Sequence, residues 1–218
     1  MIDFDKLFND FVFREHKPKS IGRYYPSEVG TCIRKLYYSY KFPKQIKPDL
    51  LKIFEMGNIL HDFVVRVLRS EKNKDIELLS WEMPFKLDME NFQISGRVDD
   101  LLVIKVSGKT VLVEVKSCGM LRAVKKPSRH HIMQLQLYMH ATGVHNGILL
   151  YIEKNNLQTK VFTIDFDELV VKETLDRFNE LHESLITNTV PVAEAKQNGD
   201  IKWMCKGCEY VDKCDSER

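Results

Sequence analysis

The chain has 218 residues, 44% hydrophobic and 29% charged, a composition typical of a globular protein. The net charge is only +2, so any surface that binds nucleic acid must be local. The apolar runs are much shorter than the roughly 20 residues of a membrane-spanning helix, and the first residues are acidic where a signal peptide is basic. We therefore expect one domain over residues 1–218, in the cytoplasm and without membrane contact.

Helical periodicity marks three segments in the first third of the chain. Asp3–Glu15 is predicted to be an amphipathic helix that packs on the core, and another helix is expected after Cys32. A longer helix is predicted from Asp49 to about Ser70, and it carries Gly57 and His61 one turn apart. Its predicted buried stripe consists of Ile53, Leu60, Val64, Val67 and Leu68.

Alternating apolar residues predict strands from Glu77 onward. Ser107 and Gly108 separate the apolar segments 101–104 and 111–116, which is the arrangement of a β-hairpin with a tight turn. Further along, the pattern predicts a helix over 128–143, strands over 147–152 and 158–164, a helix over 165–185 and a polar tail over 191–218.

The second strand of the predicted hairpin places two charged side chains on one face. Because side chains alternate along a strand, Glu114 and Lys116 point together, and a turn at Ser107-Gly108 sets Asp99 opposite Lys116. Paired carboxylates bind hard divalent cations such as Mg²⁺, and a lysine stabilises developing negative charge. On the hairpin alone, the simpler interpretation is a surface ion pair.

The predicted helix over 128–143 has a polar stripe. His131, Gln134 and Tyr138 lie at i, i+3 and i+7 on one side of it, so this stripe is a candidate for substrate contact.

Four short motifs together resemble those of RecB-like nucleases in the PD-(D/E)xK superfamily. They are Gly57-Asn-Ile-Leu-His61, Gly96-Arg-Val-Asp99, Glu114-Val-Lys116 and Gln134-Leu-Gln-Leu-Tyr138. The resemblance implies an α/β fold with a mixed central sheet flanked by helices, as in restriction endonucleases. Val98 stands where the superfamily usually has proline, a change that RecB-like members tolerate.

The same resemblance assigns roles to residues. His61, Asp99, Glu114 and the Val115 carbonyl would bind Mg²⁺ or Mn²⁺, and Lys116 would assist catalysis. Gln134 and Tyr138 would shape the active site or orient DNA.

Three of the five cysteines lie close together near the C-terminus. Cys205, Cys208 and Cys214 are compact enough for one metal centre, and Cys32 is the candidate for the fourth ligand. Cys118 follows the predicted catalytic strand and is interpreted as a spare thiol. Four thiolates suit zinc or an iron-sulfur cluster, and the spacing does not decide between them. Packing thiols without a metal are the simpler alternative.

This split arrangement of cysteines resembles that of the CRISPR-associated RecB-like exonuclease family, which carries a 4Fe-4S cluster. The resemblance implies that residues 22–48 and 191–218 form a cysteine-cluster region beside a catalytic core over 49–190. A cluster joining the two segments would close a very long loop.

A basic segment lies between Lys116 and Gln134. Its cationic side chains, Arg122, Lys125, Lys126 and Arg129, are candidates for contacting DNA phosphates without reading sequence. An ordinary solvated loop is the alternative interpretation.

The residues and the resemblance together predict a metal-dependent DNA nuclease. The resemblance favours single-stranded or free-ended DNA, cut as a 5′ to 3′ exonuclease with additional endonuclease activity, in CRISPR adaptation or repair. The alternative function is a non-catalytic DNA-binding or adaptor subunit that works with CRISPR adaptation or repair proteins. The alternative cofactor is zinc in place of the iron-sulfur cluster.

Overall fold

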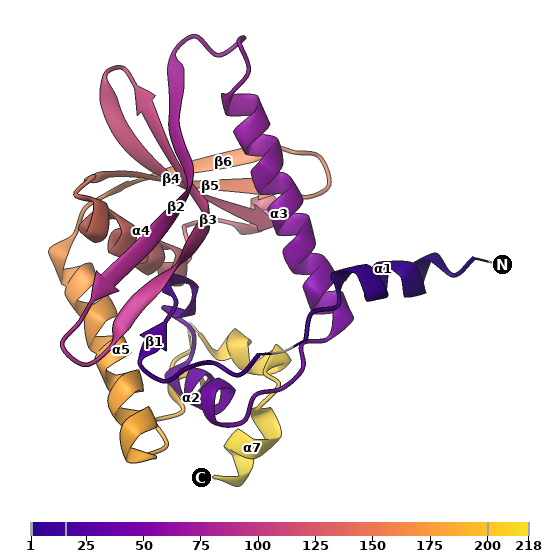
Figure 1. Ribbon diagram of the computed structural model, residues 1–218, viewed down its shortest axis with the longest axis vertical. Coiled ribbons are helices and arrows are strands. Elements are labelled where there is room, and N and C mark those ends of the chain that lie inside the picture. The colour runs from indigo at the N-terminus through magenta and orange to yellow at the C-terminus, as the bar shows by residue number, and fades with distance from the viewer. Residues whose placement is uncertain (1, 16, 200, 218) are drawn as a thin grey trace. The chain divides into compact units, whose positions relative to one another are not determined.

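The computed structural model describes residues 2–15, 17–199 and 201–217, without the side chains of 82–83 and 97–101. The chain forms two compact units, and elements of each are labelled in Figure 1. The first unit comprises Met1–Glu15, Ile46–Phe85 and Arg97–Phe166. The second unit comprises His16–Gln45, Lys86–Gly96 and Asp167–Arg218.

The described part of the chain contains both helices and strands, as in a mixed α/β fold. The α-helices are α1 (Phe4–Val12), α2 (Ile33–Lys41), α3 (Pro48–Leu68), α4 (Arg129–Thr142), α5 (Glu168–Thr187), α6 (Glu194–Gln197) and α7 (Val211–Ser216). Short 3-10 helices are η1 (Pro26–Glu28), η2 (Leu121–Ala123) and η3 (Lys202–Gly207). The strands are β1 (Arg23–Tyr24), β2 (Ile76–Asp88), β3 (Gln93–Val106), β4 (Lys109–Cys118), β5 (Asn146–Glu153) and β6 (Thr159–Asp165).

In the described residues, these strands form one six-stranded sheet in the order β1-β3-β4-β5-β6, with β2 paired to β3. The β3–β4 and β5–β6 pairs are antiparallel, whereas β4 and β5 are parallel and α4 connects them. A crossover helix between parallel strands is the expected connection. The predicted mixed sheet with flanking helices is therefore confirmed.

The β3–β4 hairpin has the predicted turn. Ser107 and Gly108 both have positive φ, 49° and 79°, as a two-residue hairpin turn with right-handed twist requires. The pairs run from Leu101 opposite Glu114 to Val106 opposite Lys109, which is the predicted register over these residues.

The two faces of β4 meet different helices. Val113 and Val115 belong to the core cluster that also contains Leu60 and Val64 of α3. On β5, Gly147 lies directly under α4, because a Cβ added there would be 2.9 Å from Leu135 Cδ2. Residue pairing between the parallel strands puts Glu114 and Lys116 on the face that α4 covers.

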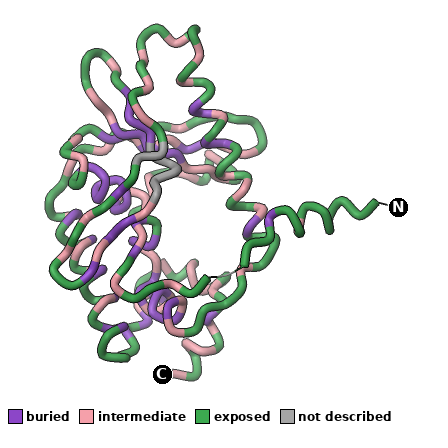
Figure 2. Tube along the Cα trace, viewed as in Figure 1, coloured by how far each residue is buried: buried purple, intermediate pink, exposed green. Residues whose placement is uncertain are grey.

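Two expectations about buried helix faces were wrong. Figure 2 shows α1 as largely exposed, and Phe4, Phe8 and Phe11 are exposed because α1 buries only Val12. On α3, the predicted Leu60 and Val64 are buried, whereas Ile53 and Val67 are exposed, and Val65 joins the buried face in their place. Among the described helices, none combines the length and apolar character needed to cross a membrane.

Candidate active site and cysteine pocket

Glu114 and Lys116 form an ion pair on β4. The distance from Lys116 Nζ to Glu114 Oε1 is 2.5 Å, and the Glu114 side chain is fully buried while that of Lys116 is 16% exposed. Strand alternation places both on one face, as the sequence predicts. A buried carboxylate is costly unless a charge partner or a metal compensates it, so this pair differs from the surface ion pair of the simpler interpretation.

The other predicted metal ligands are Asp99 on β3, His61 on α3 and the Val115 carbonyl on β4. The Asp99 side chain lies outside the described residues. His61 is 4% exposed, and its Nε2 has no hydrogen-bond partner among the described residues. It lies on α3, one turn after Gly57, and the neighbouring Leu60 packs with Val113 and Val115 of β4. The Val115 side chain is buried in that same core.

The residues present fit a divalent cation. Carboxylate oxygen suits Mg²⁺ and Mn²⁺, and a neutral imidazole nitrogen is a common metal ligand. A buried His61 Nε2 without a described partner is an observation of this structure that metal ligation would explain. For the described residues as they stand, no three His, Cys, Asp or Glu side chains are already arranged as ligands of one ion.

Gln134 and Tyr138 are brought together one turn apart on α4. Gln134 Nε2 donates to the Tyr138 hydroxyl at 2.8 Å, and both side chains are buried. The Tyr138 ring packs edge-on against Phe85 with centroids 5.3 Å apart. This burial suits shaping the site rather than reaching into solvent.

Tyr151 on β5 is a site residue that the sequence did not reveal. It is the Cα partner of Lys116 across the parallel strands, and its hydroxyl lies 2.7 Å from His131 Nδ1 and accepts from Ser128 N–H at 3.1 Å. The sequence signal for Tyr151 was a hydroxyl group within the apolar run 147–152. The structure adds that Tyr151 pairs with Lys116 across β4 and β5, which places this hydroxyl at the candidate site.

The histidines beside Lys116 are neutral at pH 7. Burial, then the charge of Lys116, lowers the pKa of His130 to about 4. The pKa of His131 is lowered to about 2 by burial, then by His130 and Lys116. Burial also raises the pKa of Tyr151, so its hydroxyl keeps its proton. His130, His131 and Tyr151 are therefore uncharged hydrogen-bonding groups near Lys116.

The basic segment is anchored at its backbone and exposed at its side chains. Leu121 N–H donates to Glu153 Oε2 at 2.7 Å, and Lys160 Nζ donates to the Val124 carbonyl at 2.7 Å. The exposed cationic residues are Arg122, Lys125, Lys126 and Arg129. An anchored backbone with exposed cationic side chains suits contact with a polyanion.

The second unit contains four of the five cysteines. They line one pocket: Cys32, Cys205, Cys208 and Cys214. Cys118 does not line it, as expected for the spare thiol. Arg34, Lys35 and Lys196 also line the pocket, and cations favour thiolates and the anionic clusters they bind. The donor set therefore fits zinc or an iron-sulfur cluster.

Arg34 links the pocket to the C-terminal segment. Its Nη1 donates to Cys214 Sγ at 3.9 Å, and its Nε donates to the Pro191 carbonyl at 2.6 Å. Tyr38, one turn further along α2, donates to Glu217 Oε2 at 2.6 Å. Protein contacts thus already hold α2 beside the segment that carries three of the cysteines.

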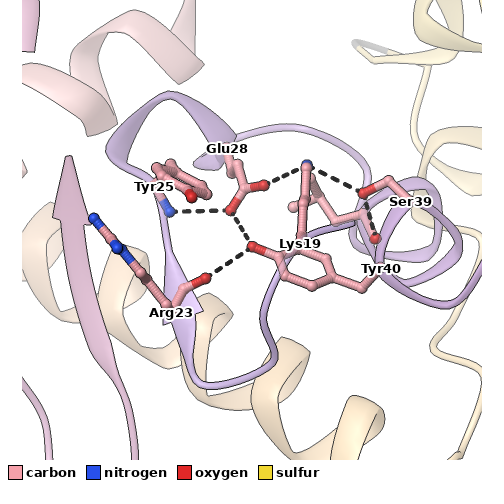
Figure 3. A network of polar contacts seen from close by, with 7 residues as sticks. Lys19, Arg23, Tyr25, Glu28, Ser39 and Tyr40 are labelled. Atoms are coloured by element: carbon pink, nitrogen blue, oxygen red, sulfur yellow. Dashed lines mark hydrogen bonds and ion pairs between the residues drawn. The ribbon is translucent and has the colours of Figure 1, made fainter. Parts of the chain in front are cut away.

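A buried carboxylate organises the backbone that leads into Cys32. Glu28 accepts hydrogen bonds from Lys19 Nζ at 2.6 Å, from the Tyr25 backbone N–H at 3.0 Å and from the Tyr40 hydroxyl at 2.8 Å (Figure 3). It is 6% exposed, so these bonds replace the water it has lost. The network fixes η1 against α2.

Comparison with known proteins gives one curated relative and several solved structures of similar fold. The chain is 24% identical over 192 residues to the CRISPR-associated exonuclease Cas4 of Saccharolobus solfataricus, covering 87% of this chain and 86% of the relative. The crystal structure of SSO0001 superposes with a TM-score of 0.66 at 22% identity, over 99% of this chain and 97% of that one. The alkaline exonuclease LHK-Exo of Laribacter hongkongensis gives 0.54 at 16% identity, over 77% and 90%.

These structural likenesses establish the fold. A family model described as the PD-(D/E)XK nuclease superfamily matches residues 56–215, which contain the β3–β4 hairpin, α4 and the C-terminal cysteines. The match covers most of the chain, and it includes Glu114 and Lys116. This chain belongs to the PD-(D/E)XK nuclease superfamily.

Proposed function

We propose that this nuclease hydrolyses phosphodiester bonds of DNA with Mg²⁺ or Mn²⁺, held by His61, Asp99, Glu114 and the Val115 carbonyl. When bound, the metal supplies a Lewis acid that polarises the phosphate and activates water. Lys116 stabilises the negative charge that develops on the phosphate. Gln134 and Tyr138, which are hydrogen-bonded to each other on α4, shape the active site or orient the DNA.

The observation that carries the proposal is the buried Glu114–Lys116 pair, at 2.5 Å with Glu114 fully buried. Two residues apart on one strand, the pair supplies a carboxylate for a metal and a cation for the phosphate from one rigid element. A purely structural pair would be expected at the surface, where it costs less desolvation.

DNA is proposed to run along the basic segment. Arg122, Lys125, Lys126 and Arg129 are exposed and belong to the loop that connects β4 to α4, so phosphates bound there would lie beside Lys116. Contacts to phosphate carry no sequence information, which suits a nuclease that degrades many sequences.

We further propose a 5′ to 3′ exonuclease acting on single-stranded or free-ended DNA, with additional endonuclease activity. The likeness to the CRISPR-associated exonuclease Cas4 and to an alkaline exonuclease supports an exonuclease. A structure of LHK-Exo in complex with dAMP shows that this related fold accommodates a nucleotide. A role in CRISPR adaptation or DNA repair, with the proteins of those pathways as partners, follows from the same likeness.

A 4Fe-4S cluster is proposed at Cys32, Cys205, Cys208 and Cys214. The shared pocket and its cationic lining support this set of ligands. The cluster would join residues 22–48 to 191–218, beside a catalytic core over 49–190, and its binding free energy would add to the stability of folding.

The test of the nuclease is cleavage of single-stranded DNA labelled at either end, by anaerobically purified protein with Mg²⁺ or Mn²⁺ and with a chelator. Lys116→Ala and Asp99→Ala should lose cleavage, and shortening from one labelled end gives the polarity. Lys109→Ala is the matched control, since Lys109 is an exposed lysine at the other end of β4. Cleavage that survives Lys116→Ala, or no metal-dependent cleavage by folded wild-type protein, would reject the proposal in favour of a DNA-binding adaptor.

The cluster is tested separately by iron, sulfide and zinc analysis of the same preparation, together with visible absorbance. Cys208→Ser should lose iron and brown colour, whereas Cys118→Ser should retain both. Stoichiometric zinc without iron would assign the pocket to zinc instead.

A further inference from the structure

Of the polar stripe on α4, His131 is the member that reaches solvent. Gln134 and Tyr138 are buried and bonded to each other, whereas His131 is half-buried. It lies in the first turn of α4, next to the exposed Arg129. The catalytic roles described above leave His131 and Tyr151 without a function.

The contacts of Tyr151 determine where the His131 ring carries its proton. A phenol has one proton to donate and two lone pairs to accept with. Ser128 N–H donates to the Tyr151 oxygen at 3.1 Å, and His131 Nδ1 is 2.7 Å from the same oxygen. If Nδ1–H also donated, the oxygen would accept twice and its own proton would have no acceptor recorded among the described residues. The satisfied arrangement is Tyr151 O–H donating to an unprotonated Nδ1.

A neutral imidazole with Nδ1 unprotonated carries its proton on Nε2. His131 is neutral at neutral pH because of its burial, so Nε2–H is a fixed, uncharged donor. Two cationic residues lie near it: Lys116 on β4, which pairs with Glu114 and lowers the pKa of His131, and Arg129, which is two residues away. The neighbouring His130 ring, with its centroid 4.0 Å away, is neutral as well. A neutral N–H donor near Lys116 can donate a hydrogen bond to an oxygen atom of an anionic ligand.

We propose that Tyr151 holds His131 with its proton on Nε2, and that this N–H donates a hydrogen bond to a backbone phosphate of DNA beside Lys116. His131 is then a substrate-binding residue and Tyr151 is the residue that positions it. The inference rests on the proposed nuclease function. A neutral N–H donor adds a hydrogen bond to the phosphate without placing a second positive charge beside Lys116.

The first test needs no activity. Long-range ¹H–¹⁵N correlation spectra of protein labelled in histidine should show His131 protonated on Nε2 and unprotonated on Nδ1 at pH 7, with the signal assigned by its loss in His131→Gln. Tyr151→Phe should give a mixture of tautomers. A ring protonated on Nδ1 in the wild type, or an unchanged tautomer in Tyr151→Phe, would overturn the positioning step.

The second test distinguishes loss of the Nε2–H donor from a general effect of the substitution on folding. The glutamine amide nitrogen stands near the position of Nε2, whereas the asparagine amide stands near Nδ1. His131→Ala and His131→Asn should raise KM for single-stranded DNA about tenfold, with a smaller change in kcat, because one hydrogen bond to a charged group is lost. His131→Gln should stay within about twofold of the wild type. His140→Gln, at an exposed histidine in the last turn of α4, is the control.

Equal KM values for wild type and His131→Ala, or an equal loss in the Gln and Ala variants, would overturn the phosphate contact. The same comparison by fluorescence anisotropy with Ca²⁺ measures binding alone. If wild-type protein does not cut DNA, the nuclease proposal fails, but the anisotropy series still decides whether His131 binds the DNA backbone.

Discussion

Arg177 on α5 and Glu194 on α6 form a bidentate ion pair, with Nη2–Oε1 at 2.7 Å and Nη1–Oε2 at 2.9 Å. Arg177 also donates to the Thr31 carbonyl at 3.0 Å, and Glu194 accepts from Ile33 N–H at 2.8 Å. The pair therefore binds the residues on both sides of Cys32. It holds the start of α2, and with it one wall of the cysteine pocket, to the C-terminal segment.

Replacing Arg177 with Met should lower the free energy of unfolding by about 2 kcal/mol, because hydrogen bonds to a partly buried charge are lost. Urea denaturation measures this. The matched control is Lys172→Met on the same helix, whose pair with Asp176 is exposed and should be worth less than about 0.5 kcal/mol. Equal changes in the two variants would show that the Arg177 pair has no special structural role.

Replacing Gly147 with Ala should destabilise the protein by about 1–3 kcal/mol, since overpacking forces neighbouring atoms apart. The new Cβ would lie 2.9 Å from Leu135 Cδ2 and 3.2 Å from both the Ile164 carbonyl oxygen and Met139 Sδ. The carbonyl oxygen belongs to a paired strand and cannot easily move. Thermal or urea unfolding measures the loss.

Gly119→Ala is the control for Gly147→Ala, because a Cβ at Gly119 would meet nothing within 4 Å. It should be neutral or slightly stabilising, as alanine restricts the unfolded chain. A Gly147→Ala protein as stable as Gly119→Ala would mean that α4 does not pack as closely on β5 as the structure shows.

The sequence was most informative where local signals specify the structure. A tight turn at Ser107-Gly108 determines the register of the β3–β4 hairpin, and alternation then places Glu114 beside Lys116. The helix that begins after Ser128 ends at Gly143, whose φ of 70° is the left-handed conformation common after a helix. Such features depend on a few neighbouring residues, so they can be predicted from sequence.

Features that depend on distant packing were missed. The periodicity of Asp3–Glu15 does not say whether another element covers the helix, and most of that stripe proved exposed. The short elements of the C-terminal tail, α6, η3 and α7, have no periodicity long enough to detect. Tyr151 and His131 are twenty residues apart, and only the parallel pairing of β4 and β5 brings their contact next to Lys116.

The basic segment should contribute to DNA affinity through charge alone. Lys125→Gln and Lys126→Gln should weaken binding of all single-stranded sequences equally, and each should reduce the slope of log K against log salt by about 0.7. Lys109→Gln, an exposed lysine outside the segment, is the control. Anisotropy titrations over a range of salt concentrations measure both quantities. Unchanged slopes would show that phosphates do not contact the segment.

The depressed pKa values of His130 and His131 make stability depend on pH. Both are lowered from 6.5, to about 4 and about 2, with burial as the largest cause. The unfolded chain takes up protons below about pH 6.5 while the folded protein does not, so stability is lost as the pH falls from about 6.5 toward 4 for His130 and toward 2 for His131, and is unaffected above. Each histidine costs at most about 2 kcal/mol at pH 5. Urea denaturation at pH 7 and pH 5 should therefore show a smaller acid-induced loss in His131→Gln than in the wild type or the His140→Gln control. If all three lose the same stability, His131 is not held neutral in the folded protein.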